Sequence, residues 1–148
     1  MIAIGSDHGG YALKLKIMEF LEAEKYEVKD FGICSEHSVD YPDIALPVAQ
    51  AIINNECEKG ILICGTGLGI SIAANKVRGI RAAVCTDSYM ARMSREHNNA
   101  NILALGGRVI GVDLGLDIVH TWLKSEFKGG RHLTRVNKIC EIEKNFLK

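Results

Sequence analysis

The feature that most constrains the fold is an alternation, repeated along the chain, between short apolar runs and longer amphipathic stretches. The apolar runs occupy residues 2–5, 28–31, 61–64, 81–85 and 102–105. The amphipathic stretches, with apolar residues at helical spacing, occupy residues 11–24, 42–55, 68–75, 88–95, 113–124 and 131–148. Strands that alternate with helices form a parallel sheet with helices on both faces. We therefore predict an α/β fold of three layers around a parallel sheet of about five strands.

Length and charge limit the kind of protein further. The 148 residues fit one domain, and we expect a single domain over residues 1–148. The formal net charge is zero, which argues against binding to nucleic acid or to a membrane surface. The first residues carry no basic segment of a signal peptide, and no apolar run reaches the roughly 18 residues of a membrane span. Five cysteines without a CxxC pair favour a reducing cytoplasm over disulfides or a zinc site.

Polar and glycine-rich segments follow four of the predicted strands. They are residues 6–8, 64–69, 86–87 and 106–108. In open parallel sheets ligands bind at the carboxyl ends of the strands, near the point where the strand order reverses. We therefore look for the functional site among these four segments.

The turn Cys64-Gly65-Thr66-Gly67-Leu68-Gly69 is the most informative of them. Its alternate glycines let the backbone approach a ligand and turn its N–H groups inward, and a helix starts directly after it. Such a turn could hold a phosphate or an oxyanion that develops during a reaction. It could also be a tight turn without a ligand. The spacing fits neither the GxGxxG dinucleotide fingerprint nor a Walker motif.

Cys64 ends the buried apolar run, directly before these glycines. Aligned N–H groups at a helix N-terminus favour the thiolate form of a cysteine. A thiolate here could take a proton from carbon while the N–H groups stabilise the enediolate that forms. The other four cysteines lack this setting, and we expect them to be packed side chains: Cys34, Cys57, Cys85 and Cys140.

Histidines and arginines supply further candidates. Asp7 and His8 follow the first strand and could bind sugar hydroxyls. His97 could move protons between a sugar ring oxygen and water. Arg131 and Arg135 share one helix face and could bind a phosphate together with Arg108, because the planar guanidinium group suits a dianion. A solvated helix face explains the pair of arginines equally well.

The sequence resembles the type B ribose-5-phosphate isomerases and the related galactose-6-phosphate isomerase subunits over essentially its whole length. The resemblance rests on GSDHGG at 5–10, DYP at 40–42, GILICGTGLGISIAANK at 60–76, REHNNAN at 95–101 and GGRH at 129–132. It implies a Rossmann-like sheet, a reaction through a cis-enediol without metal or other cofactor, and a homodimer with shared active sites that could pair into a tetramer. The helix at 131–148 is expected to pack on the partner subunit.

The resemblance also implies a role for each matching residue. Cys64 would be the base and His97 would assist ring opening, with Thr66 donating its hydroxyl near O1. The turn would hold the enediolate through Gly65, Gly67, Leu68 and Gly69. The sugar would be bound by Asp7, His8, Asn98 and Tyr41, and its phosphate by Arg108, Arg131 and Arg135. His97, Asn98 and Arg108 would come from the partner subunit. Some members of the family carry Glu at the position of Ile70 and lack the cysteine.

The predicted reaction is the interconversion of D-ribose 5-phosphate and D-ribulose 5-phosphate, and three alternatives stay open at this stage. The first is a six-carbon substrate, allose 6-phosphate or galactose 6-phosphate. The second is a Rossmann-type nucleotide-binding module without isomerase activity. The third is covalent catalysis by the thiol of Cys64, which would leave an adduct on that residue.

Overall fold

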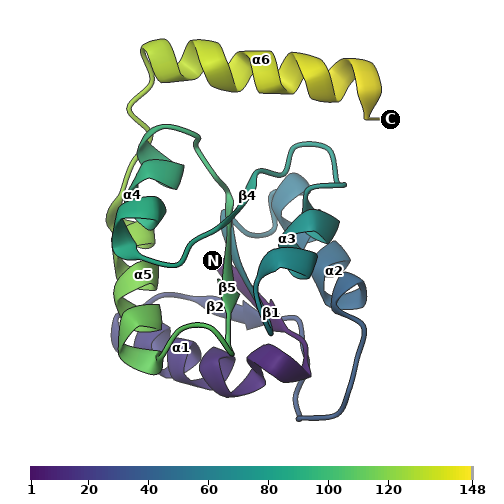
Figure 1. Cartoon of the computed structure of the whole chain (residues 1–148), viewed down its shortest axis with the longest axis vertical. Helices are drawn as coiled ribbons and strands as arrows, with labels where there is room; N and C mark the ends of the chain where they lie inside the picture. Colours follow the sequence, from purple (N-terminus) through teal and green to yellow (C-terminus); the bar gives the residue numbers. More distant parts are fainter. Residues whose placement is uncertain (148) are drawn as a thin grey trace.

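The computed structural model describes residues 1–147 and contains a five-stranded parallel sheet between two layers of helices (Figure 1). The strands are β1 (Ile2–Ser6), β2 (Val28–Asp30), β3 (Lys59–Cys64), β4 (Ala82–Val84) and β5 (Ile102–Gly106). They pair in the order β2-β1-β3-β5-β4. The predicted fold class is confirmed, and each predicted apolar run overlaps one of the strands.

Each face of the sheet has its own apolar core. The helices α1 (Tyr11–Ala23), α4 (Ser88–Glu96) and α5 (Val112–Lys124) cover one face, and α2 (Tyr41–Ile53) and α3 (Leu68–Ala74) cover the other. Successive side chains of a strand point to opposite faces. In β3, Ile61 and Ile63 therefore pack in the first core, while Leu62 and Cys64 pack in the second. A strand buried on both faces explains why this run is apolar without interruption.

The strand order determines which loops meet. From β1 the chain moves outward to β2 and then crosses to β3 on the other side of β1, so the strand order reverses between β1 and β3. Because β5 lies beside β3, the loops that follow β1, β3 and β5 are neighbours at the carboxyl edge. β4 is an edge strand beyond β5, which removes Thr86 and Asp87 from the centre. Asp87 instead caps α4, where its carboxylate accepts a hydrogen bond from Met90 N (2.8 Å).

Local sequence signals place most helix ends correctly. Pro42 lies in the first turn of α2, as predicted, and Trp122 of α5 is completely buried. One element was not predicted, the single 3₁₀ turn η1 (His8–Gly10) between β1 and α1. It forms because the Asp7 carboxylate accepts a hydrogen bond from Gly9 N (2.9 Å).

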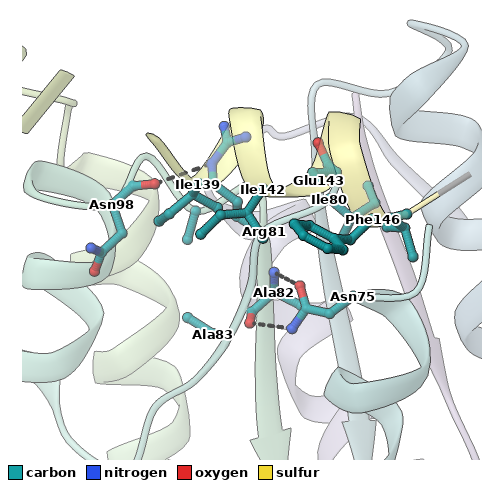
Figure 2. Close-up of a pocket in the computed structure, with 12 residues that line it drawn as sticks. Asn75, Ile80, Arg81, Ala82, Ala83, Asn98, Ile139, Ile142, Glu143 and Phe146 are labelled. Carbon is teal, nitrogen blue, oxygen red and sulfur yellow. Dashed lines mark hydrogen bonds between the residues drawn. The ribbon is translucent and has the colours of Figure 1, made fainter. Parts of the chain in front are cut away.

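The last helix, α6 (Arg131–Phe146), stands apart from the two layers and runs past the amino ends of the strands (Figure 1). Val136 is its only buried residue. Its apolar residues Leu133, Ile139, Ile142 and Phe146 are exposed. A groove of about 520 Å³ lies between α6 and the start of β4, and Figure 2 shows the three last of these side chains directed toward Ala82. No helix within residues 1–147 has the length and apolarity to cross a membrane.

Candidate active site

Three glycine-bearing loops come together at the carboxyl edge of the sheet. Backbone hydrogen bonds join them: Asp7 N donates to Ile63 O (3.2 Å), Gly107 N to Cys64 O (2.8 Å) and Arg108 N to Gly65 O (3.0 Å). The loops are so close that a Cβ atom at Gly106 or Gly107 would lie 2.7 Å or 2.5 Å from a backbone oxygen of another loop. Side chains at these positions would force the loops apart, so the glycines are required for this packing.

The thiol of Cys64 lies under the turn that follows β3. Its Sγ accepts a hydrogen bond from Gly67 N (3.1 Å). Gly67 can present its N–H in this direction because its φ of +81° is a conformation that favours glycine, and it forms the N-cap of α3. Cys64 is buried, with 4% of its surface exposed. A backbone N–H directed at sulfur stabilises the thiolate, which is the form that can act as a base.

Two other buried cysteines have a different environment. Burial raises the pKa of the Cys57 thiol, and it raises the pKa of Cys85 to about 11. The thiol of Cys85 lies 4.0 Å from the Ser94 hydroxyl, which offsets a small part of that effect. Both groups are therefore neutral near pH 7. Cys34 and Cys140 are exposed.

Polar side chains from η1, its N-cap and α2 surround the turn. Asp7 is buried, and one of its carboxylate oxygens caps η1. The Nδ1 atom of His8 accepts a long hydrogen bond from Val39 N (3.4 Å), so a neutral His8 carries its proton on Nε2. The ring of Tyr41 packs on Gly69, where a Cβ atom would lie 2.6 Å from its Cζ.

Thr66 and Arg108 complete this group within the same chain. The exposed Thr66 accepts a hydrogen bond from Leu68 N at its Oγ1 (3.2 Å). The guanidinium of Arg108 crosses Gly65, and a Cβ atom there would lie 3.4 Å from Arg108 Nη1. Arg108 therefore lies beside the Cys64 turn of its own chain, and its expected contribution to the site of a partner stays a prediction. We call the following residues the cysteine cluster: Asp7, His8, Tyr41, Cys64, Gly65, Thr66, Gly67, Leu68, Gly69 and Arg108.

The remaining predicted residues lie together elsewhere. The imidazole rings of His97 and His132 are stacked, with centroids 4.0 Å apart and planes 10° from parallel. Partial burial, together with the neighbouring His97, Arg131, Arg135 and Lys128, lowers the pKa of His132. Asn98 follows His97, and its carbonyl accepts a hydrogen bond from Arg81 Nε (3.1 Å; Figure 2). We call the following residues the histidine cluster: His97, Asn98, Arg131, His132 and Arg135.

The two clusters lie at opposite ends of the parallel strands. β3 and β5 are parallel, with Gly60 opposite Ile102 and Cys64 opposite Gly106. His97 and Asn98 precede β5 at the amino edge, whereas Cys64 lies at the carboxyl edge. At about 3.3 Å per residue, the strand alone separates these edges by about 13 Å. One chain therefore brings together the cysteine cluster but does not bring the histidine cluster to it.

Sequence reasoning missed two residues that the structure connects to these clusters. His132 belonged to a matching motif but had no assigned role, and no spacing signal pairs it with His97. Lys14 lies in the predicted helix at 11–24 and had no assigned role, yet its side chain is completely buried and contacts Asp30 (2.8 Å) and the carbonyl oxygen of Ile33. Within residues 1–147, no group of three or more His, Cys, Asp or Glu residues is arranged to hold a metal ion.

Comparison with known proteins places this geometry in a family. The model of the ribose/galactose isomerase family matches residues 2–139. Ribose-5-phosphate isomerase B of Escherichia coli is 51% identical over 142 residues, which cover 96% of this chain and 95% of that protein.

Solved structures agree with this match. The chain is similar to ribose-5-phosphate isomerase B of Clostridium thermocellum, with a TM-score of 0.97 and 71% identity over 98% of both chains. It is also similar to ribose-5-phosphate isomerase B of Mycoplasma genitalium with bound ribulose-5-phosphate. That TM-score is 0.93, with 43% identity over 97% of this chain and 95% of that one.

Proposed function

Because this chain belongs to the ribose/galactose isomerase family, we propose that it interconverts D-ribose 5-phosphate and D-ribulose 5-phosphate with Cys64 as the base. The chain is a sugar-phosphate isomerase. The observation that supports the role of Cys64 is the hydrogen bond from Gly67 N to its Sγ, beside the point between β1 and β3 where the strand order reverses. In open α/β sheets this is the place where ligands bind.

The proposed chemical step is a proton transfer between two neighbouring carbons. In the direction from aldose to ketose, the Cys64 thiolate takes the proton from C2 of the open aldehyde, and the electron pair of that C–H bond forms the C1–C2 double bond of an enediolate. The negative charge develops on O1, where backbone N–H groups of residues 65–69 and the Thr66 hydroxyl can donate hydrogen bonds. The proton of O2 then moves to O1 while the thiol returns its proton to C1, which leaves the ketose with a hydroxyl at C1 and restores the thiolate.

Ring opening must precede this step, because ribose 5-phosphate is mostly a furanose. We assign it to His97. Its neutral imidazole takes the proton of the C1 hydroxyl and delivers a proton to the ring oxygen, so the bond from C1 to O4 breaks as the C1 carbonyl forms. The protonation state of the protein is unchanged at the end. Asp7, His8, Tyr41 and Asn98 would hold the sugar oxygens.

The phosphate is assigned to three arginines. Arg131 and Arg135 lie one turn apart near the start of α6, and their planar guanidinium groups suit a dianion. Arg108 belongs to the cysteine cluster, so in a shared site it would bind the same phosphate from the other copy of the chain. A substrate that bridges the two clusters would thus be bound by arginine from both.

We further propose that the active site forms between two copies of the chain, in a homodimer that functions in the cytoplasm. The separation of the two clusters within one chain supports a shared site, since His97 and Cys64 cannot act on one sugar across the sheet. The exposed apolar side chains of α6 support packing of this helix on a partner. An arrangement with two-fold symmetry would place the histidine cluster of each copy against the cysteine cluster of the other.

The role of Cys64 is tested by replacing it with Ala and with Ser and measuring kcat in both directions, without added metal. Loss of a general base lowers kcat by about 10²- to 10⁴-fold. Replacement of Cys57 by Ala is the matched control, because this cysteine is buried to a similar degree outside both clusters. Near wild-type turnover in the Cys64→Ala variant would exclude Cys64 as the base.

The shared site is tested by mixing two inactive variants, Cys64→Ala and His97→Ala, and refolding them together. Each mixed dimer would contain one site with both residues intact and one site with neither. Random pairing makes half of the dimers mixed, so about a quarter of the wild-type activity should return. Recovery of no activity would show that both residues must come from the same chain.

A further inference from the structure

We propose that His132 is a positioning residue for His97, which fixes the imidazole plane for opening of the sugar ring. This inference rests on the proposed function, since it assigns a partner to the group that opens the ring. His132 is the second residue of α6, whereas His97 is the C-cap of α4, so the contact joins two elements that are far apart in sequence.

The geometry of the pair suits this role. The ring centroids are 4.0 Å apart and the planes differ by 10°, so each ring covers one face of the other. Aromatic stacking of this kind is favourable beyond the area that it buries. The nitrogens of an imidazole lie on its edge, and proton transfer takes place there. A stacked neighbour therefore fixes the plane of His97 and leaves its nitrogens accessible.

The backbone on both sides of the stack is held in place. Lys128 N donates a hydrogen bond to Glu96 O (3.1 Å), and the Lys128 ammonium lies 3.5 Å from the Glu96 carboxylate. These contacts attach the segment before α6 to the end of α4. His132 N donates to Gly129 O (3.0 Å) and His97 N to Met93 O (2.8 Å), which fixes each histidine relative to its own helix. The ring of His132 is thus presented to His97 by an anchored segment.

Charge around the stack keeps the supporting ring neutral. The pKa of His132 is lowered by partial burial and by the neighbouring side chains of His97, Arg131, Arg135 and Lys128. Glu96 is the acidic group at this junction. When His97 holds the proton that it transfers, it therefore faces an uncharged ring, and the two imidazoles do not repel each other.

The two substrates provide a test that separates this role from a general structural one. Ribose 5-phosphate closes its ring through O4. Ribulose 5-phosphate cannot form a furanose, because the oxygen that would close it carries the phosphate. Exchange of the C1 proton of ribulose 5-phosphate with deuterated water therefore requires the Cys64 step but no ring opening. A residue that acts only through His97 should affect the first substrate and spare the second.

The experiment compares the variants His132→Ala and His132→Phe, with His120→Ala as a control at an exposed histidine outside both clusters. We expect His132→Ala to lower kcat for ribose 5-phosphate by about 10-fold or more, while the exchange rate of ribulose 5-phosphate stays within about 2-fold. His132→Phe retains a flat ring and should recover most of the lost rate. In a His97→Ala background, His132→Ala should cause no further loss, because a positioning residue has nothing left to position.

Three results would overturn the inference: a wild-type rate in His132→Ala, an equal loss with both substrates, or additive losses in the double variant. Thermal denaturation shows whether each variant is folded, and His132→Phe keeps the test decisive if the alanine variant is not. Failure of the proposed function has a different signature, since the wild-type protein would then show neither turnover nor exchange.

Discussion

Replacement of Gly67 by Ala tests the turn on which the proposed chemistry depends. Two effects add at this position. The φ of +81° is strained for a residue with a side chain, which costs roughly 1–2 kcal/mol. The new Cβ would also lie 2.9 Å from the carbonyl carbon of Leu105 and 3.2 Å from Gly106 N, both backbone atoms. Relief of such overpacking typically costs about 1–3 kcal/mol more.

Together these effects predict a loss of about 2–5 kcal/mol in the free energy of unfolding. The turn must move away from β5 to relieve the contact, and the N–H of residue 67 then loses its alignment with Cys64 Sγ, now at 3.1 Å. We therefore expect kcat to fall by about 10-fold or more even in the folded fraction, because loss of one preorganised donor costs about 10²–10³ in related sites.

Two other glycines separate the contributions. Gly79 has a similar φ of +92°, but a Cβ there would meet only a side-chain carbon of Ile53 at 3.4 Å, so Gly79→Ala reports the backbone strain alone. Gly106→Ala introduces a contact of 2.7 Å with Thr66 O at a glycine without positive φ, and so reports the steric effect. Urea denaturation at one protein concentration measures stability, and initial rates measure kcat. If Gly67→Ala matched Gly79→Ala in stability and the wild type in kcat, the argument for the turn would be refuted.

Two further predictions concern buried groups outside the turn. Burial raises the pKa of Cys85 from 9.0 to about 11, so its contribution to stability is complete below about pH 9 and is lost as the pH rises to 11. At about 1.4 kcal/mol per pKa unit the loss approaches about 3 kcal/mol, and it should be absent from the pH curve of Cys85→Ala; identical pH dependence in both proteins would contradict the prediction. Lys14→Met should lower the free energy of unfolding by about 2–4 kcal/mol, because the completely buried ammonium binds Asp30 at 2.8 Å. The exposed Lys16, 3.8 Å from Glu19, is its control, and Lys16→Met should change stability by less than about 1 kcal/mol; equal effects would count against the buried pair.

Local patterns in the sequence were sufficient for the sheet and for the glycine-rich turn that follows Cys64. The run at residues 61–64 is buried on both faces, and such a strand must lie inside a parallel sheet. The glycines after it could be recognised because a close backbone approach excludes side chains. Their contact partners could not be recognised, since Gly107 meets Gly9 only after β1, β3 and β5 have become neighbours. Thr86 and Asp87 were included among the possible site segments for the same reason: no single strand shows its place in the strand order, and β4 proved to be an edge strand.

The histidine cluster shows a second limit of the sequence. His97 is separated from His132 by a strand and a complete helix, and nothing in either local pattern announces a stacked pair. The helix α6 adds to this difficulty: its apolar residues have the spacing of any amphipathic helix, whether its own chain or another covers them. Lys14 was missed because a lysine among apolar helix positions is usually at the surface. Its burial depends on acceptors that only the fold brings to it, the carboxylate of Asp30 and the carbonyl oxygen of Ile33.

The division of the proposed site between two edges of the sheet has a consequence for catalysis. The cysteine cluster is fixed by short backbone contacts between three loops, so Cys64 Sγ and its N–H donor are already aligned in a single chain. The histidine cluster is fixed by the stack and by the attachment of Lys128 to α4, so it is also aligned in a single chain. Proton abstraction and ring opening would then each be preorganised before association, and the contact between subunits would set only the distance between them. It follows that substitutions in the exposed apolar face of α6 should abolish turnover of ribose 5-phosphate without changing the hydrogen bond at Cys64 or the stack at His97.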